Sequence, residues 1–130
     1  MLAVGESVGA RIYARRKWND TQVDLVAGHE YACTAEGRWV DLLIPSDADG
    51  YASGRLLTLR LTERLRRVPS ARWFALIGVV VGAPEPAFLI GKSRMIVPLT
   101  GGRLKCFAND LSFMYWNNYG SVQLTVTRLA

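Results

Sequence analysis

The sequence is poor in histidine and cysteine and has no long apolar run, which argues against several kinds of catalytic, disulfide-bonded and membrane protein. Its 130 residues include one histidine and two cysteines. The single His29 has no recognisable nucleophile or acid partner, and two cysteines are too few for a disulfide framework. No apolar run approaches the roughly 18 residues of a membrane-spanning helix, and the N-terminus lacks the charged start and apolar core of a signal peptide. We therefore expect no membrane span, a cytoplasmic location by default, and small buried thiols at Cys33 and Cys106.

Catalytic motifs are incomplete as well. Asp47 and Asp49 are two nearby carboxylates, but residues at i and i+2 of an Asp-Ala-Asp-Gly turn do not face each other across a substrate as a glycosidase pair does. Residues 90–93 read Ile-Gly-Lys-Ser, like the end of a phosphate-binding loop, yet Pro86 occupies a position where that motif requires glycine. The sequence therefore favours a binding protein over an enzyme.

Alternating apolar and polar residues predict an all-β protein. Residues 8–14, 104–108 and 122–126 each place their apolar side chains on one face, as half-buried strands do. From 73 to 81 both alternating sets are apolar, which predicts a central strand covered on both faces, or covered by a loop on its outer face. Turn-forming sequences separate these runs. We expect a single domain, residues 1–130, folded as a small antiparallel β-sandwich of jelly-roll type.

The segment 55–67 interrupts this pattern. Leu57, Leu61 and Leu65 follow a helical spacing, although Leu57, Leu59 and Leu61 also alternate as a strand would. Good helix formers follow up to Arg67, and Pro69 cannot continue a helix. We therefore predict one short helix here that ends before the proline.

The most informative segment for function is a polar cluster at residues 109–120, set between two strand-like runs. Asp110, Asn117 and Asn118 offer hard oxygen donors, which suit calcium rather than zinc or copper. A loop of this length can return those side chains toward a common centre, where the Met114 carbonyl would add a further oxygen. Calcium takes about six to eight oxygens, so a ligand's hydroxyls could complete the shell. The alternative is that Asn-Asp and Asn-Asn simply form turns.

The order of residues in this cluster resembles that of the bacterial calcium-dependent galactophilic lectins, the family of the galactose-binding soluble lectin of pseudomonads. In that family an Asn-Asp pair is followed by a loop, an aromatic residue, two amide or acidic residues, and a glycine that opens the last strand. Here the corresponding residues are 109–110, Tyr115, 117–118 and Gly120. Weaker similarities occur at 19–21, 35–39, 75–78 and 88–91.

The resemblance implies a calcium-dependent module that binds galactose or a galactose-type glycoconjugate. It implies side-chain ligands at Asp110, Asn117 and Asn118, which would also bond the sugar, and backbone ligands at Met114 and Leu42. Nearby aromatic side chains would cover the sugar's apolar face; these are Trp116, Tyr119 and Tyr51. The resemblance is also compatible with a homo-oligomer and with export without a classical signal. The family's sugar-contacting histidine and glutamine have no counterpart here.

Charge supplies the alternative function. Six of the 16 basic residues lie between Arg55 and Arg72, against one acidic residue, Glu63, and the formal net charge is +5. A basic face on the same fold would bind nucleic acid or an acidic protein partner, and the polar loop would then be purely structural. The simpler interpretation is a solvated surface on which some arginines pair with acidic residues, namely Asp41, Asp47 or Asp49. Base-recognition motifs are absent from the sequence, so we expect no specific nucleic-acid binding.

Overall fold

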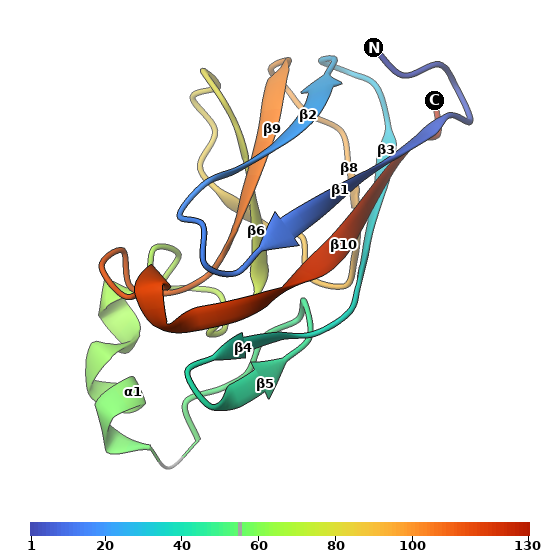
Figure 1. Cartoon of the computed structure of the whole chain (residues 1–130). Helices are drawn as coiled ribbons and strands as arrows, with labels where there is room; N and C mark the ends of the chain where they lie inside the picture. The colour runs from blue at the N-terminus through green and yellow to red at the C-terminus, as the bar shows by residue number, and fades with distance from the viewer. Residues whose placement is uncertain (55) are drawn as a thin grey trace.

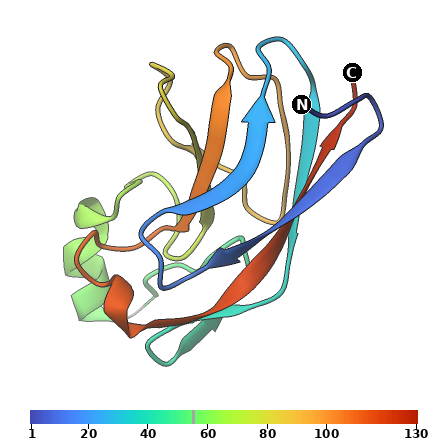
Figure 2. The ribbon, with the colours of Figure 1, turned by 45° about the horizontal axis from the view of Figure 1, so that its top comes forward.

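Two antiparallel β-sheets pack face to face in the computed structural model, which describes residues 1–54 and 56–130 (Figures 1 and 2). The strands are β1 (Ser7–Tyr13), β2 (Asn19–Leu25), β3 (Tyr31–Glu36), β4 (Trp39–Asp41), β5 (Ile44–Ser46), β6 (Leu76–Val80), β7 (Phe88–Leu89), β8 (Ser93–Ile96), β9 (Gly102–Ala108) and β10 (Asn118–Arg128). One helix, α1 (Leu57–Thr62), and two 3₁₀ turns, η1 (Glu63–Leu65) and η2 (Tyr115–Asn117), complete the secondary structure. The expected antiparallel β-sandwich is confirmed.

The larger sheet is organised around the long strand β10. β1 pairs with it along one side, while β3 and β4 pair with it in one continuous register, interrupted at residues 37 and 38. Strands β8 and β5 lie outside β3 and β4 respectively, and the second sheet has the order β2-β9-β6-β7. The register of β4 on β10 places Asp41 opposite Asn118. Two segments distant in sequence therefore meet where β10 begins.

The core lies between the sheets and confirms the predicted alternation. Its largest fully buried side chains come from both layers and include Trp39, Phe74, Leu104 and Leu124. β6 is an inner strand, as predicted from its doubly apolar sequence, and a smaller cluster covers its outer face. That cluster consists of Ala71, Ala75, Ile77 and Phe107, with Val68, Val79 and Ala87 packed against it. The loop that precedes β6 thus acts as a lid on the outer face of the second sheet.

The predicted short helix is present and ends before Pro69, as expected. α1 spans Leu57–Thr62 and continues into η1, while Arg55, the first residue of the predicted segment, lies outside the described residues. None of the six residues of α1 is buried. The helix therefore does not belong to the core. It lies at one end of the sandwich, opposite the end that carries the two chain termini (Figure 1).

Two expectations drawn from composition can be compared with the structure. Cys33 and Cys106 are both buried and free, and burial raises the pKa of the Cys33 thiol to about 11. Across residues 1–54 and 56–130, no helix has the length and apolar character needed to cross a membrane.

Candidate functional site

A cleft of about 360 Å³ lies beside α1 at the end of the sandwich. Three segments form its walls: the turn between β4 and β5, the helix α1, and the loop that joins β9 to β10. Four of the five residues expected to bind calcium line it, namely Leu42, Asp110, Met114 and Asn117. The fifth, Asn118, donates a hydrogen bond from Nδ2 to Asp110 Oδ2 at 3.1 Å. The fold thus brings the whole predicted ligand set to one place.

Asn109 anchors the start of the β9–β10 loop. Its side chain is fully buried and accepts a hydrogen bond from the Val68 amide at 2.9 Å. Its Nδ2 donates to the carbonyls of Val68, Ala71 and Arg72 at 2.9–3.2 Å. These bonds satisfy backbone groups that the irregular segment 68–72 would otherwise bury unpaired. Asn109 therefore holds the β9–β10 loop against segment 68–72, and the next residue, Asp110, faces the cleft.

Asp110, which lines the cleft, is hydrogen-bonded to Asn118 behind it in the fold. Asp110 Oδ1 accepts the Leu111 amide at 2.7 Å, and Asn118 Nδ2 also donates to the Ala14 carbonyl at 3.0 Å. Asp110 is 3 % exposed, and Asn118 is fully buried. Both side chains are therefore fixed in orientation, as ligands of a preorganised site must be.

Asp41 is a second carboxylate at this site, and no sequence pattern placed it among the predicted site residues. It lines the same cleft, because the β4–β10 register carries it to Asn118. Burial, and secondly the negative charge of Asp41, raise the pKa of Asp110 to about 6. Burial also raises the pKa of Asp41, which accepts a hydrogen bond from the Tyr51 hydroxyl at 2.5 Å. Two carboxylates in a poorly solvated site repel each other, and a bound cation would relieve that repulsion.

Two carboxamide oxygens complete the donor set. Asn117 Oδ1 and Asn118 Oδ1 are buried, and neither accepts a hydrogen bond from any residue that the structure describes. Buried polar atoms normally have partners, so a pair without them beside two carboxylates is unusual and fits a cation site. Residues 1–54 and 56–130 contain no group of three or more histidine, cysteine or acidic side chains suited to a metal. The donors gathered here are hard oxygens only, and this chemistry fits calcium.

The backbone of Leu42 is unusual for its residue type. Its φ is +56°, a left-handed conformation that costs a non-glycine residue roughly 1 kcal/mol or more. Its amide donates to the Asn117 carbonyl at 3.1 Å, and this bond ties the β4–β5 turn to the β9–β10 loop. The strained turn is thus held against the opposite wall of the cleft.

The aromatic residues expected to contact a sugar lie at different depths. Trp116 and Tyr119 are largely exposed and do not line the cleft, and Arg15 lies over the Tyr119 ring with its Cζ 6.0 Å from the centroid. Tyr51 is half-buried and reaches the site through its bond to Asp41. Trp73, which was not among the residues expected to contact a sugar, lines the cleft and is almost fully buried.

Two side chains of the arginine-rich segment, Arg66 and Arg67, lie against aromatic rings, whereas Arg60, Arg64 and Arg72 are exposed. The Arg67 guanidinium lies 3.4 Å from the Phe107 ring centroid and 4.4 Å from that of Trp18, and it donates to the Tyr115 hydroxyl at 2.9 Å. Arg66 lies over Trp73 at 5.1 Å. These two side chains are therefore unavailable as a free basic pair, which weakens the nucleic-acid alternative.

The structure corrects the expectation that arginines of this segment pair with nearby aspartates. Among the described residues, no arginine forms a salt bridge with Asp41, Asp47 or Asp49. Asp41 bonds Tyr51 instead, and Asp47 lies 4.0 Å from the ammonium of Lys92. The prediction failed because the fold places the Asp47–Asp49 turn beside the turn that precedes β8, where Asp49 Oδ1 accepts the Lys92 amide at 2.8 Å.

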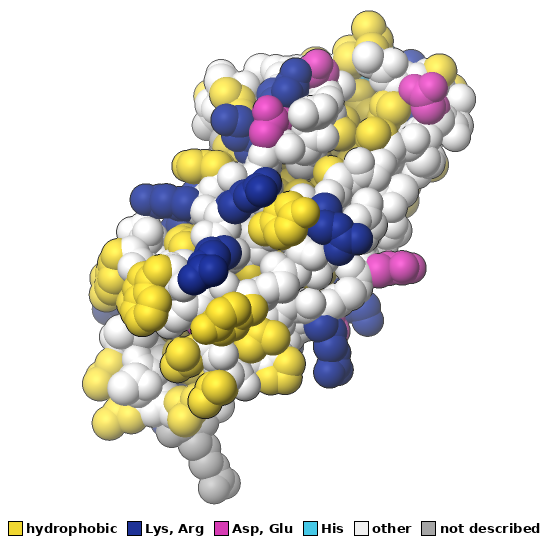
Figure 3. Space-filling view, in the orientation of Figure 1, with side chains coloured by type: hydrophobic (Ala, Val, Ile, Leu, Met, Phe, Trp, Pro, Cys, Tyr) yellow, Lys and Arg dark blue, Asp and Glu magenta, His cyan; other side chains and the backbone are white. Residues whose placement is uncertain are grey.

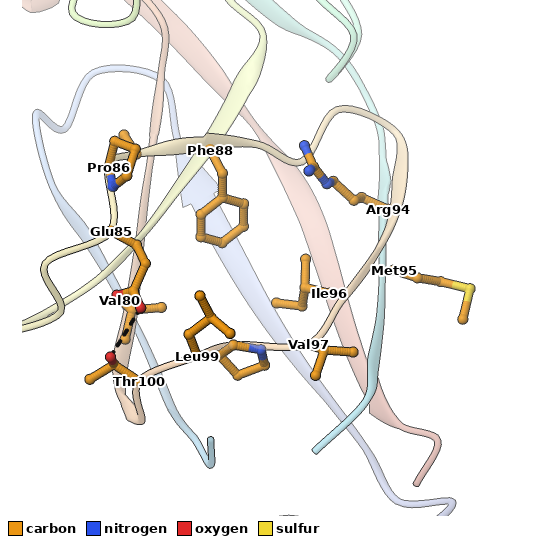
Figure 4. Close-up of a pocket in the computed structure, with 12 residues that line it drawn as sticks. Val80, Glu85, Pro86, Phe88, Arg94, Met95, Ile96, Val97, Leu99 and Thr100 are labelled. Atoms are coloured by element: carbon orange, nitrogen blue, oxygen red, sulfur yellow. Dashed lines mark hydrogen bonds between the residues drawn. The ribbon is translucent and has the colours of Figure 1, made fainter. Parts of the chain in front are cut away.

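A second cleft of similar volume, about 360 Å³, lies between the edge strands β7 and β8 (Figure 4). Its walls are mainly apolar and include Phe88, Ile96 and Leu99. Glu85 is its one acidic side chain, and Glu85 Oε1 accepts a hydrogen bond from Thr100 at 3.0 Å. This second cleft lacks a convergent set of polar groups, so the cleft beside α1 is the stronger candidate for the functional site.

Comparisons with known proteins agree with the architecture. No protein-family model matches the chain, and no curated protein matches it. In three dimensions the chain is similar to a solved structure described as the N-terminal domain of EclA, a PllA-like lectin. The TM-score is 0.67, and the match covers 92 % of this chain and 94 % of that one. The sequence identity is 17 %, so the likeness establishes a shared fold.

Proposed function

We propose that this protein binds carbohydrate through a calcium ion held in the cleft beside α1. The proposal rests on one observation: the carboxylates of Asp41 and Asp110 lie close to the carboxamide oxygens of Asn117 and Asn118, which accept no hydrogen bond from any described residue. Carboxylate and amide oxygens form calcium sites, and the two carboxylates would need a cation to offset their repulsion. The fold shared with a lectin and the resemblance of residues 109–120 to the galactophilic lectins point the same way.

The residues that would hold calcium are the side chains of Asp110, Asn117 and Asn118, with backbone oxygens from Met114 and Leu42. Asp41 would contribute the second negative charge. The two charges should give tighter binding than the single carboxylate evident from the loop sequence, because calcium affinity rises with the number of charged ligands. When bound, calcium would supply positions at which two neighbouring hydroxyls of a sugar can coordinate.

The protein's own side chains would orient the sugar. Asp110 and Asn118 are held by the Leu111 amide, the Ala14 carbonyl and the bond between them. Asn118 Oδ1 and the remaining lone pairs of the Asp110 carboxylate would accept hydrogen bonds from sugar hydroxyls without losing packing. Trp116 and Tyr119 stand exposed near the loop and offer apolar faces of the kind that cover a sugar's C–H groups. Galactose or a galactoside is the proposed ligand, on the strength of the resemblance. The proposed role is binding without catalysis.

Calorimetric titration tests the two parts of this proposal in sequence. Calcium is titrated into chelator-stripped protein, and galactose is then titrated into the calcium-loaded protein and, separately, into protein kept in chelator. We expect one calcium site per chain and galactose binding only with calcium. Asn117→Ala and Asn118→Ala should weaken both steps. Asp24→Asn, a change of an exposed carboxylate on β2, is the matched control and should alter neither.

The outcomes separate the metal from the sugar. If the stripped protein takes up no calcium at millimolar concentration, the metal site is refuted. If calcium binds but galactose and an array of other glycans do not, the site is a structural cation site and the carbohydrate function fails.

A further inference from the structure

The rim of the cleft carries exposed apolar side chains on all three of its walls. Leu43 in the β4–β5 turn is 85 % exposed, and Leu57 and Leu61 on α1 are 66 % and 73 % exposed. Phe113 and Trp116 in the β9–β10 loop are 66 % and 65 % exposed. Figure 3 shows hydrophobic side chains gathered over the end of the molecule that carries α1. Exposed apolar patches rimmed by polar residues mark interaction surfaces.

The helix α1 divides its residues between the cleft and the solvent. Thr58, Leu59 and Thr62 line the cleft, whereas Leu57 and Leu61 point away from it, together with Arg60 and, in η1, Arg64. All four of these outward side chains are exposed. Leucine and arginine thus alternate on one face of a helix that buries no residue in the core. This combination is typical of helices that lie in the interface of a lipid bilayer, where long basic side chains reach the headgroups.

Charge distinguishes a bilayer from a second copy of the chain. Within residues 42–43, 57–65 and 110–117, which are all described, the acidic side chains are Glu63, which is half-buried, and Asp110, which is buried. A symmetric dimer through this face would therefore bring arginines close to arginines without an exposed carboxylate to offset them. An anionic membrane surface offers the complementary charge, and interfacial tryptophan is a common membrane anchor.

We infer that this rim, formed by Leu43, Leu57, Leu61, Phe113 and Trp116 with Arg60 and Arg64, is a contact surface for an anionic lipid bilayer. The apolar side chains enter the headgroup region, and the two arginines bind lipid phosphates. The inference does not depend on calcium or sugar binding, because the contacts involve neither.

Vesicle sedimentation in chelator tests the inference without the proposed calcium site. The full chain is mixed with vesicles of phosphatidylcholine alone or with added phosphatidylglycerol, neither of which carries sugar. We expect binding to the anionic vesicles only, with tryptophan fluorescence quenched by brominated lipid in the parent and much less in Trp116→Phe, because the other three tryptophans lie outside the rim. Arg60→Ser/Arg64→Ser should weaken binding about thirtyfold, because each basic residue near an anionic surface contributes roughly a factor of five. Leu57→Ser/Leu61→Ser should weaken it roughly tenfold or more.

Matched controls use exposed residues remote from the rim. Met95→Ser/Leu99→Ser removes two exposed apolar side chains near β8, and Arg11→Ser/Arg94→Ser removes two exposed charges from β1 and β8. Both controls should bind vesicles like the parent. Failure of the parent to bind anionic vesicles, or an equal loss in the controls, overturns the inference. It is also overturned if sedimentation equilibrium shows a dimer that Leu57→Ser/Leu61→Ser dissociates, because the surface would then bind a second copy.

Discussion

Replacing Asp110 by asparagine should stabilise the protein in the absence of calcium. The side chain is almost fully buried, and desolvation together with the neighbouring Asp41 raises its pKa from 3.8 to about 6. A carboxyl with a higher pKa in the folded than in the unfolded state stabilises the fold below pH 4, and this contribution is lost as the pH rises through 6. Each pKa unit corresponds to about 1.4 kcal/mol, so the cost of the ionised group at pH 7.5 is about 3 kcal/mol.

Part of that gain is lost through weaker hydrogen bonds. Asp110 accepts bonds from the Leu111 amide and from Asn118 Nδ2, and an asparagine side chain satisfies only one of these without rearrangement. A bond to a charged acceptor contributes roughly 1.5–3 kcal/mol. The net effect of Asp110→Asn at pH 7.5 in chelator should therefore be a gain in unfolding free energy of about 1 kcal/mol.

Urea unfolding of parent and variant between pH 4.5 and 7.5 measures this effect. In chelator the parent should lose stability relative to Asp110→Asn as the pH rises through 6. Saturating calcium should reverse the order at pH 7.5, because a ligand at about a hundredfold excess over its dissociation constant stabilises the parent by about 2.7 kcal/mol. If Asp110→Asn is less stable than the parent in chelator at pH 7.5, and calcium changes neither protein, the carboxylate is a loop cap and the cation-site argument is refuted.

Three further predictions concern the framework around the site, and each is measured by urea unfolding in chelator. Asn109→Ala removes the hydrogen bonds to segment 68–72 and leaves buried carbonyls unpaired, so it should cost about 3 kcal/mol; a loss below 1 kcal/mol would contradict its role as an anchor. Arg67→Lys keeps the charge but loses the planar stacking on Phe107 and should cost about 1–2 kcal/mol; an unchanged midpoint would contradict it. Gly50→Ala would bring Cβ into collision with the Trp73 carbonyl oxygen at φ +77° and should cost roughly 3 kcal/mol or more. Its control, Gly28→Ala at φ +82° with open space around it, should cost only about 1 kcal/mol.

The periodicity of the chain was sufficient to predict the strands that carry the core. Period-two alternation in 8–14, 104–108 and 122–126 places one set of side chains on a single face, and burying that face leaves little choice of element. The doubly apolar run 73–81 predicted an inner strand covered on both faces, or covered by a loop on its outer face, and the cluster of Phe107 with the loop that precedes β6 matches this prediction. The oxygen donors of residues 110–118 were also evident, because they lie in one loop, although their role as ligands remains a proposal.

Contacts between distant segments could not be predicted from the same patterns. Asp41 joins the site because β4 continues the register of β3 along β10, and no local signal specifies that register. Arg67 looked like a solvated charge, but the fold surrounds it with aromatic rings from three separate segments. The sequence by itself determined the fold class and the polar loop, since both depend on neighbouring residues. Only the tertiary structure decided that a second carboxylate, a strained turn and an exposed helix meet around that loop, because strand pairing sets those distances.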